Sequence, residues 1–184
     1  TIKISGKKVR LNGVDAPELA QKCKDLEGQT YNCGIKATQK LQELLNTMPK
    51  KSIECAFTGK DVYGRFLGEC SIGKININSW LVLNGWAFAY HKYSMKYVND
   101  EVFAMNNSTG LWNGTFIKPW RWRIGDRLDT EIETPKSDCF IKGNISSSGE
   151  KIYHTQTDRN YDDTKISLNA GEKWFCSEEE AIQN

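Results

Sequence analysis

Two short stretches of the chain carry charged residues at spacings that suit phosphate chemistry. In the first, Arg10 lies on a short apolar strand, and Asp15 and Glu18 follow at or beyond its end, on either side of Pro17. The proline ring fixes one backbone dihedral, so both carboxylates and the carbonyl of Ala16 can face one small volume. Calcium takes carboxylate and carbonyl oxygens as ligands, so this stretch predicts a cation site.

The second stretch is Asp61-Val62-Tyr63-Gly64-Arg65, about one secondary-structure element later. Its glycine favours a turn, and the guanidinium of Arg65 can make a two-pronged contact with phosphate oxygens. Taken singly, these residues also fit a blander interpretation, in which Arg10 forms a surface ion pair and the second stretch is only a hairpin turn. Two arginines with a carboxylate metal site indicate phosphodiester chemistry.

Together the two stretches resemble the motifs of the staphylococcal nuclease (thermonuclease) family, Arg-x-x-x-x-Asp-x-Pro-Glu and a later Asp-x-Tyr-Gly-Arg. The resemblance continues through Gly85-Trp86-Ala87 and Gly110-Leu111-Trp112, so it covers roughly residues 1–116. It implies an OB-fold domain that hydrolyses phosphodiester bonds in DNA or RNA by calcium-assisted attack of water.

The resemblance also implies a role for each matching residue. Asp15 and the carbonyl of Ala16 would bind calcium, and Glu18 would orient or deprotonate the attacking water. Arg10 and Arg65 would clamp the phosphate as negative charge develops on it.

Two tyrosines are expected to contact the nucleic acid. Tyr63 would stack on the nucleotide or hydrogen-bond to it, and Tyr93 would do likewise, although the register around it is ambiguous. The chain departs from the best-known family member at two positions. Ala16 replaces a threonine, which a ligand acting through its carbonyl tolerates, and Val62 replaces a lysine that assists nucleotide binding.

In this family a Gly-Asp pair that supplies a further calcium ligand precedes the threonine, and here it would fall immediately before Thr1. We therefore expect a processed or truncated chain that binds calcium weakly and has little nuclease activity. Restoring an upstream segment that ends in Gly-Asp is expected to recover both properties.

A catalytically silent OB-fold module is the alternative function. Such a module would hold single-stranded nucleic acid or a protein partner, and its acidic pair would serve only as a structural ion site. Glu18 argues against this alternative, because a binding module needs the positive charges but has no need of the glutamate.

The composition is that of a globular protein, with 184 residues of which 39% are hydrophobic and 26% charged. A net charge of +2 is too mild to indicate a broadly basic nucleic-acid-binding surface, so any basic site must be local. No apolar run approaches the roughly 18 residues of a membrane span. The first residues are not a signal peptide.

The six cysteines favour disulfides and an oxidising compartment, because their number is even and no Cys-x-x-Cys spacing is present. A count alone cannot fix the connectivity, and six free thiols in a cytosolic protein are the alternative. Sequence proximity favours three local pairs: Cys23 with Cys33, Cys55 with Cys70, and Cys139 with Cys176. The protein is therefore expected to be secreted or periplasmic in a bacterium, after removal of an N-terminal signal.

The hydrophobic pattern predicts short strands and about three helices. Five strands decorated by helices are typical of a mainly β, α+β class protein, and the resemblance implies a five-stranded Greek-key OB barrel. The expected elements are strands at Thr1–Ile4, around Val9, Ser52–Phe57 and Phe66–Ile72, an extended Trp86–Tyr90, a polar loop at Leu19–Asn32, and helices at Gly34–Met48, Ile75–Asn84 and Tyr97–Asn107.

Three regions are expected along the chain: the OB-fold domain at 1–118 with an incomplete first strand, a linker at 119–137, and a small disulfide-stapled β-rich domain at 138–184. The linker begins with Pro119-Trp120-Arg121-Trp122-Arg123, which could stack on bases or pack against the barrel. The C-terminal segments Lys-Gly-Asn-Ile, Lys-Ile-Tyr-His and Trp-Phe-Cys-Ser-Glu resemble the sunset domain, whose partner is unknown. Ser177 and Glu180 predict a capping box.

Overall fold

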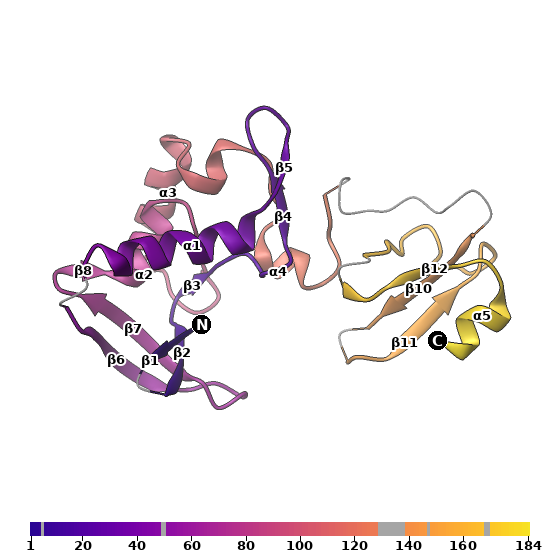
Figure 1. Cartoon of the computed structure of the whole chain (residues 1–184), viewed down its shortest axis with the longest axis horizontal. Coiled ribbons are helices and arrows are strands. Elements are labelled where there is room, and N and C mark those ends of the chain that lie inside the picture. The colour runs from indigo at the N-terminus through magenta and orange to yellow at the C-terminus, as the bar shows by residue number, and fades with distance from the viewer. Residues whose placement is uncertain (5, 49–50, 129–138, 147, 168–169) are drawn as a thin grey trace. The chain divides into compact units, whose positions relative to one another are not determined.

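The computed structural model describes residues 1–4, 6–48, 51–128, 139–146, 148–167 and 170–184. The chain forms two compact units, Thr1–Pro119 and Trp120–Asn184, and each is described by itself (Figure 1). Residues 129–137 of the expected linker lie outside the described residues. No helix in the described ranges is both long and apolar enough to cross a membrane.

The first unit combines short strands with helices. Its strands are β1 (Ile2–Ile4), β2 (Lys7–Leu11), β3 (Val14–Asp15), β4 (Lys22–Lys24), β5 (Thr30–Asn32), β6 (Ile53–Lys60), β7 (Phe66–Ile72), β8 (Ile75–Asn76) and β9 (Phe88–Ala89). Its helices are α1 (Cys33–Asn46), α2 (Ile77–Leu83), α3 (Val98–Asn106) and the 3-10 helix η1 (Gly110–Asn113), and the short α4 (Pro119–Trp122) follows at its end.

Five strands form the main sheet, in the order β1-β2-β7-β6 with β8 also paired to β7. The β2–β7 pair is parallel, whereas the other pairs of this sheet are antiparallel. Two smaller ladders join β3 to β9 and β4 to β5. The predicted class, α+β with an OB-type sheet and a small C-terminal β unit, is confirmed.

Helices α1 and α2 lie against this sheet (Figure 1), where Leu41 and Leu45 from α1 and Leu81 from α2 pack on the core. The expected helix at Ile75–Asn84 starts two residues late, because Ile75 and Asn76 pair with β7. The side chain of Asn76 then caps α2 by accepting from the Ser79 N–H at 2.9 Å.

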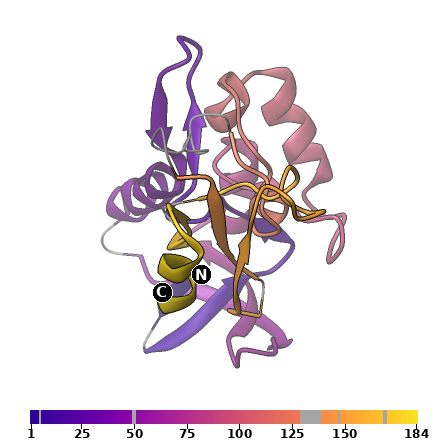
Figure 2. The same cartoon turned by 90° about the vertical axis from the view of Figure 1, so that its right-hand side faces the viewer.

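The expected polar loop at Leu19–Asn32 is wrong in part, because β4 and β5 form a hairpin there. Its strand sequences, Lys-Cys-Lys and Thr-Tyr-Asn, are too short and polar to show an alternating pattern. Tertiary contacts stabilise the hairpin instead: the backbone of Lys24 exchanges two hydrogen bonds with that of Thr115. The hairpin projects away from the main sheet in both views (Figures 1 and 2).

The second unit contains β10 (Ile141–Ile145), β11 (Lys151–His154), β12 (Lys173–Phe175) and α5 (Glu178–Gln183), with strand order β11-β10-β12. Gly143 allows the Phe175 ring to cover β10, since an added Cβ would lie 2.3 Å from a ring carbon. The predicted capping box is confirmed in its Ser177 half, whereas the Glu180 side chain bonds to the residue before the cap and not to the cap residue itself. The Ser177 hydroxyl accepts from the Glu180 N–H at 3.2 Å, and the Glu180 carboxylate accepts from the Cys176 N–H at 2.9 Å.

All three predicted disulfides are confirmed: Cys23–Cys33, Cys55–Cys70 and Cys139–Cys176. Cys55 lies directly opposite Cys70 in the β6–β7 ladder, on the two strands that flank the Asp61–Arg65 turn. Cys139–Cys176 joins the segment two residues before β10 to the residue just after β12.

Removing the Cys139–Cys176 disulfide is expected to destabilise the second unit most. The bond closes a span of 37 residues in a unit too small to bury a large core. We expect replacement of both cysteines by alanine to lower the free energy of unfolding by about 3–5 kcal/mol, in the chain-entropy account. Denaturant unfolding followed by tryptophan fluorescence measures this change; a loss below about 1 kcal/mol would contradict the prediction.

Candidate active site

A pocket of about 590 Å³ opens between β2, the residues that follow β3, and α1. Its apolar wall includes Ala37 and Leu41 of α1 together with Trp86. Its charged lining residues are Lys3, Arg10, Asp15, Glu18 and Arg65. The fold therefore brings the two charged stretches of the sequence into one cavity.

Arg10 and Asp15 lie together on one side of this pocket. The Arg10 Nη2 atom lies 3.7 Å from Asp15 Oδ1, and the Asp15 side chain is only 5% exposed. Asp15 is buried because β3 pairs it with Phe88 of β9. This pairing fixes the carboxylate, so the arginine and the candidate metal ligand share one electrostatic environment.

Arg65 is held by the turn that precedes it. The Asp61 Oδ1 atom accepts from the N–H groups of Tyr63 and Arg65, both at 3.0 Å, and Gly64 adopts the positive φ that closes the turn. The Arg65 Nε donates to Asp61 Oδ2 at 2.7 Å, and Nη2 lies 2.7 Å from the same oxygen. Nη1 donates to the Thr1 hydroxyl at 3.1 Å. The guanidinium carries more donors than these contacts use, so it can also bind a phosphate.

The pKa of Asp61 reflects this pairing. Desolvation acts to raise the pKa, but hydrogen bonds from Arg65 and Tyr63 and the charge of Arg65 lower it below the ordinary value. A carboxylate whose pKa is lower in the folded state contributes stability above its unfolded pKa, and loses it as the pH falls through the folded pKa.

An Asp61→Asn variant removes the charge of Asp61 but keeps its hydrogen bonds to the turn, because an amide oxygen can still accept from the Tyr63 and Arg65 N–H groups. We expect this variant to be less stable than the wild type near neutral pH. The difference should shrink as the pH is lowered from about 5 towards 2. Denaturant unfolding at each pH measures it, and a difference that stays constant across this range would contradict the assignment.

The pocket offers oxygen donors of the kind that calcium takes. Asp15, Glu18 and the peptide of Ala16 line it together. Within the described ranges, no group of three or more His, Cys, Asp and Glu side chains is close enough to hold a metal ion. The donors therefore fit calcium in chemical type. Calcium usually takes about six to eight oxygen ligands, so water or substrate would have to supply the others.

The two predicted nucleic-acid-binding tyrosines are exposed and do not line the pocket. Tyr63 is 80% exposed, and the Arg65 guanidinium lies 5.3 Å from its ring centroid. Tyr93 is 61% exposed, and its ring meets that of Tyr90 edge-on at 4.9 Å. Tyr90 follows β9, and its N–H donates to the Gly13 carbonyl just before β3. Tyr63 therefore lies beside Arg65, whereas Tyr93 lies on a separate loop.

In the segment that could stack on bases or pack against the barrel, Arg127 covers one face of Trp122. The Arg127 guanidinium lies 4.0 Å from the Trp122 ring centroid, and its Nη1 donates to the Trp122 carbonyl. Arg121 pairs with Asp126 at 2.7 Å. Arg121, Trp122 and Arg127 therefore make contacts within this segment.

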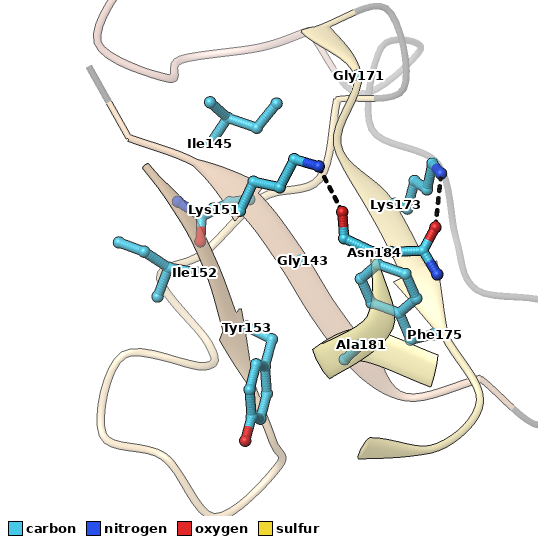
Figure 3. A pocket seen from close by; sticks show the side chains of 11 residues that line it. Gly143, Ile145, Lys151, Ile152, Tyr153, Gly171, Lys173, Phe175, Ala181 and Asn184 are labelled. Carbon is cyan, nitrogen blue, oxygen red and sulfur yellow. Dashed lines mark hydrogen bonds between the residues drawn. The ribbon is translucent and has the colours of Figure 1, made fainter. Parts of the chain in front are cut away.

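A second pocket, of about 150 Å³, lies in the second unit (Figure 3). Its walls include Ile145, Ile152 and Phe175. Lys151 donates to the backbone oxygen of Asn184, and Lys173 donates to the Asn184 side chain at 3.2 Å. The polar side chains among its described lining residues are those of Asn144, Lys151, Tyr153, Lys173 and Asn184.

Sequence comparison agrees with the fold and the pocket. Residues 8–114 match the model of the staphylococcal nuclease homologue family. The chain belongs to this family, and the matched range contains Arg10, Asp15, Ala16, Glu18 and Arg65.

Several relatives support the same assignment. The chain is 37% identical over 115 residues to the succinoglycan biosynthesis protein ExoI of Rhizobium meliloti (strain 1021). This match covers 61% of this chain and 59% of ExoI. It is 33% identical over 129 residues to an uncharacterized endonuclease of Haemophilus influenzae, covering 68% and 65%. It is 31% identical over 117 residues to endonuclease YhcR of Bacillus subtilis (strain 168), covering 58% and 9%. The chain thus spans less than two thirds of the length of these relatives.

Proposed function

We propose that this protein is a nuclease that hydrolyses phosphodiester bonds in DNA or RNA. The observation that carries the proposal is the meeting of Arg10, Glu18 and Arg65 with Asp15 in one pocket. Two relatives that are named as endonucleases support the same reaction class. Hydrolysis of a phosphodiester needs a positioned water, a base for its proton, and cations to stabilise charge on the phosphate oxygens.

The three side chains divide these tasks. Glu18 accepts a proton from the attacking water, whose oxygen forms a bond to phosphorus as the opposite phosphorus–oxygen bond breaks. Arg10 and Arg65 bind the phosphate oxygens and stabilise the negative charge that develops there. The leaving oxygen takes a proton from solvent. Asp61 acts through Arg65, because it orients the guanidinium.

We further propose that calcium is the cofactor and that Asp15 and the carbonyl of Ala16 hold it. Both groups carry the hard oxygen donors that calcium binds, and the buried Asp15 is fixed by its strand. When bound, calcium would neutralise charge on the phosphate.

The substrate is nucleic acid, with Tyr63 the stronger candidate for a stacking contact because it adjoins Arg65. Tyr93 would contact a more distant part of the strand. The three disulfides support a secreted or periplasmic location, since such bonds persist in oxidising compartments. The resemblance of the second unit to a sunset domain stays a prediction, as does any partner that it binds.

Release of nucleotides from single-stranded DNA and RNA, with calcium or with a chelator, tests the proposal against the silent binding module. A nuclease releases acid-soluble nucleotides only when calcium is present. Because an upstream Gly-Asp is expected to strengthen the site, the assay is run with and without that extension. Retention of intact nucleic acid by both forms, with no release at any calcium concentration, would favour the binding module.

A further inference from the structure

The backbone of Glu18 makes two hydrogen bonds, and both of them are with the buried residue Gln21. The Glu18 N–H donates to Gln21 Oε1 at 3.2 Å, and the Gln21 N–H donates to the Glu18 carbonyl at 2.8 Å. The Gln21 side chain is fully buried and donates from Nε2 to the carbonyl of Ile117 at 2.6 Å. A single side chain thus ties the Glu18 backbone to a segment 96 residues away in sequence.

The first turn of α1 packs against the backbone of Glu18. Gly34 lies so close that an added Cβ would stand 1.8 Å from the Glu18 carbonyl oxygen. The Gly34 N–H also points to the Gln21 carbonyl, at 3.4 Å. Any side chain at position 34 must therefore displace the backbone of Glu18.

The Cys23–Cys33 disulfide connects these contacts. It joins β4, two residues after Gln21, to the first residue of α1, directly before Gly34. Cys23 and Cys33 are both buried. The disulfide therefore fixes the distance between the two backbone segments that hold Glu18 from either side.

We propose that Gln21 is a positioning residue for the catalytic base Glu18, and that the Cys23–Cys33 disulfide holds Gln21 and Gly34 in place around it. This inference rests on the proposed function, because it assigns these residues to the reaction of the same pocket. Displacement of a catalytic group by about 1 Å can lower a rate by roughly a hundredfold. Loss of this support should therefore lower kcat rather than substrate binding.

A double-mutant cycle tests the role of Gln21. Gln21→Met keeps the size of the side chain and removes both of its hydrogen bonds. We expect it to lower kcat by about tenfold to a hundredfold and to change KM by less than about twofold. In a Glu18→Gln background the same change should lower kcat by less than about twofold, since the base it positions is already gone.

Gln29→Met is the matched control, because Gln29 lies exposed in the β4–β5 hairpin that directly follows Gln21. It should leave kcat unchanged in both backgrounds. An equal loss from Gln21→Met with and without the Glu18 carboxylate would overturn the proposal, because it would show an effect on the fold alone. Unchanged kcat in Gln21→Met would overturn it as well.

The disulfide is tested by two paired replacements. Alanine at both Cys23 and Cys33 should lower kcat by about tenfold or more, whereas alanine at both Cys55 and Cys70 should lower only the melting temperature. Cys55–Cys70 is a suitable control because it lies within the β6–β7 ladder and none of its atoms lines the pocket. Equal kcat losses in the two variants would contradict the proposed role of the first disulfide.

Amide hydrogen exchange keeps this inference separate from the proposed function. The Glu18 amide donates to the Gln21 side chain, so its exchange should accelerate by about tenfold or more in Gln21→Met whether or not the protein is an enzyme. Faster exchange in a protein without nuclease activity would remove the proposed function and keep the positioning contact. Unchanged exchange would remove the positioning contact itself. Gly34→Ala gives a second variant should Gln21→Met fail to fold.

Discussion

Replacing Glu18 with glutamine is expected to lower kcat by about a hundredfold to ten-thousandfold, the usual contribution of a general base. The amide keeps the shape of the side chain but cannot accept the proton of the attacking water. The backbone contacts of Glu18 with Gln21 do not involve the changed atoms, so the fold should be retained. Steady-state nuclease kinetics and thermal unfolding together measure this outcome.

Glu27→Gln provides the matched control, since Glu27 is exposed on the β4–β5 hairpin and its replacement makes the same change in net charge. Its turnover should equal that of the wild type. Unchanged turnover in Glu18→Gln would show that Glu18 is a spectator, and another residue of the pocket would have to accept the proton.

Replacing Arg65 with lysine is expected to lower kcat by about a hundredfold to a thousandfold, as for the loss of one preorganised donor in a charge-stabilising site. An ammonium group cannot contact Asp61, Thr1 and a phosphate with the fixed fork of a guanidinium. Arg10→Lys is expected to have a similar effect. Nuclease kinetics with a calcium titration measure both variants.

Arg159→Lys is the control, because Arg159 is exposed in the second unit. Circular dichroism and the melting temperature should show that each of the three variants folds. Near wild-type turnover in Arg10→Lys or Arg65→Lys would remove that residue from the mechanism.

The charged residues of the site were predictable because local chain geometry constrains them. Arg10 lies on a strand, Pro17 restricts the segment between Asp15 and Glu18, and Gly64 marks the turn that presents Arg65. The helix at α1 and the β6–β7 hairpin followed from hydrophobic periodicity and the cysteine spacing. The five predicted catalytic and metal-binding residues line one pocket.

The supporting contacts were not predictable from local pattern. Gln21 is buried only because Ile117 supplies a distant carbonyl, and a glutamine at the edge of a polar segment gives no sign of this. The hairpin around Cys23 depends in the same way on backbone bonds between Lys24 and Thr115. The pairing of Asp61 with Arg65 left a weak signal, because aspartate commonly accepts from the backbone in turns.

Reaction in water enriched in heavy oxygen tests the central claim most directly. The wild-type protein and Glu18→Gln, both carrying the upstream Gly-Asp extension, are incubated with single-stranded DNA and calcium, and the phosphate ends of the products are analysed by mass spectrometry. Attack of water on phosphorus predicts one heavy oxygen in each new phosphate end formed by the wild type, and no labelled product above background with Glu18→Gln. Bound but uncleaved DNA in both samples, or equal labelling by the two proteins, would contradict the assignment of this pocket as a nuclease active site with Glu18 as its base.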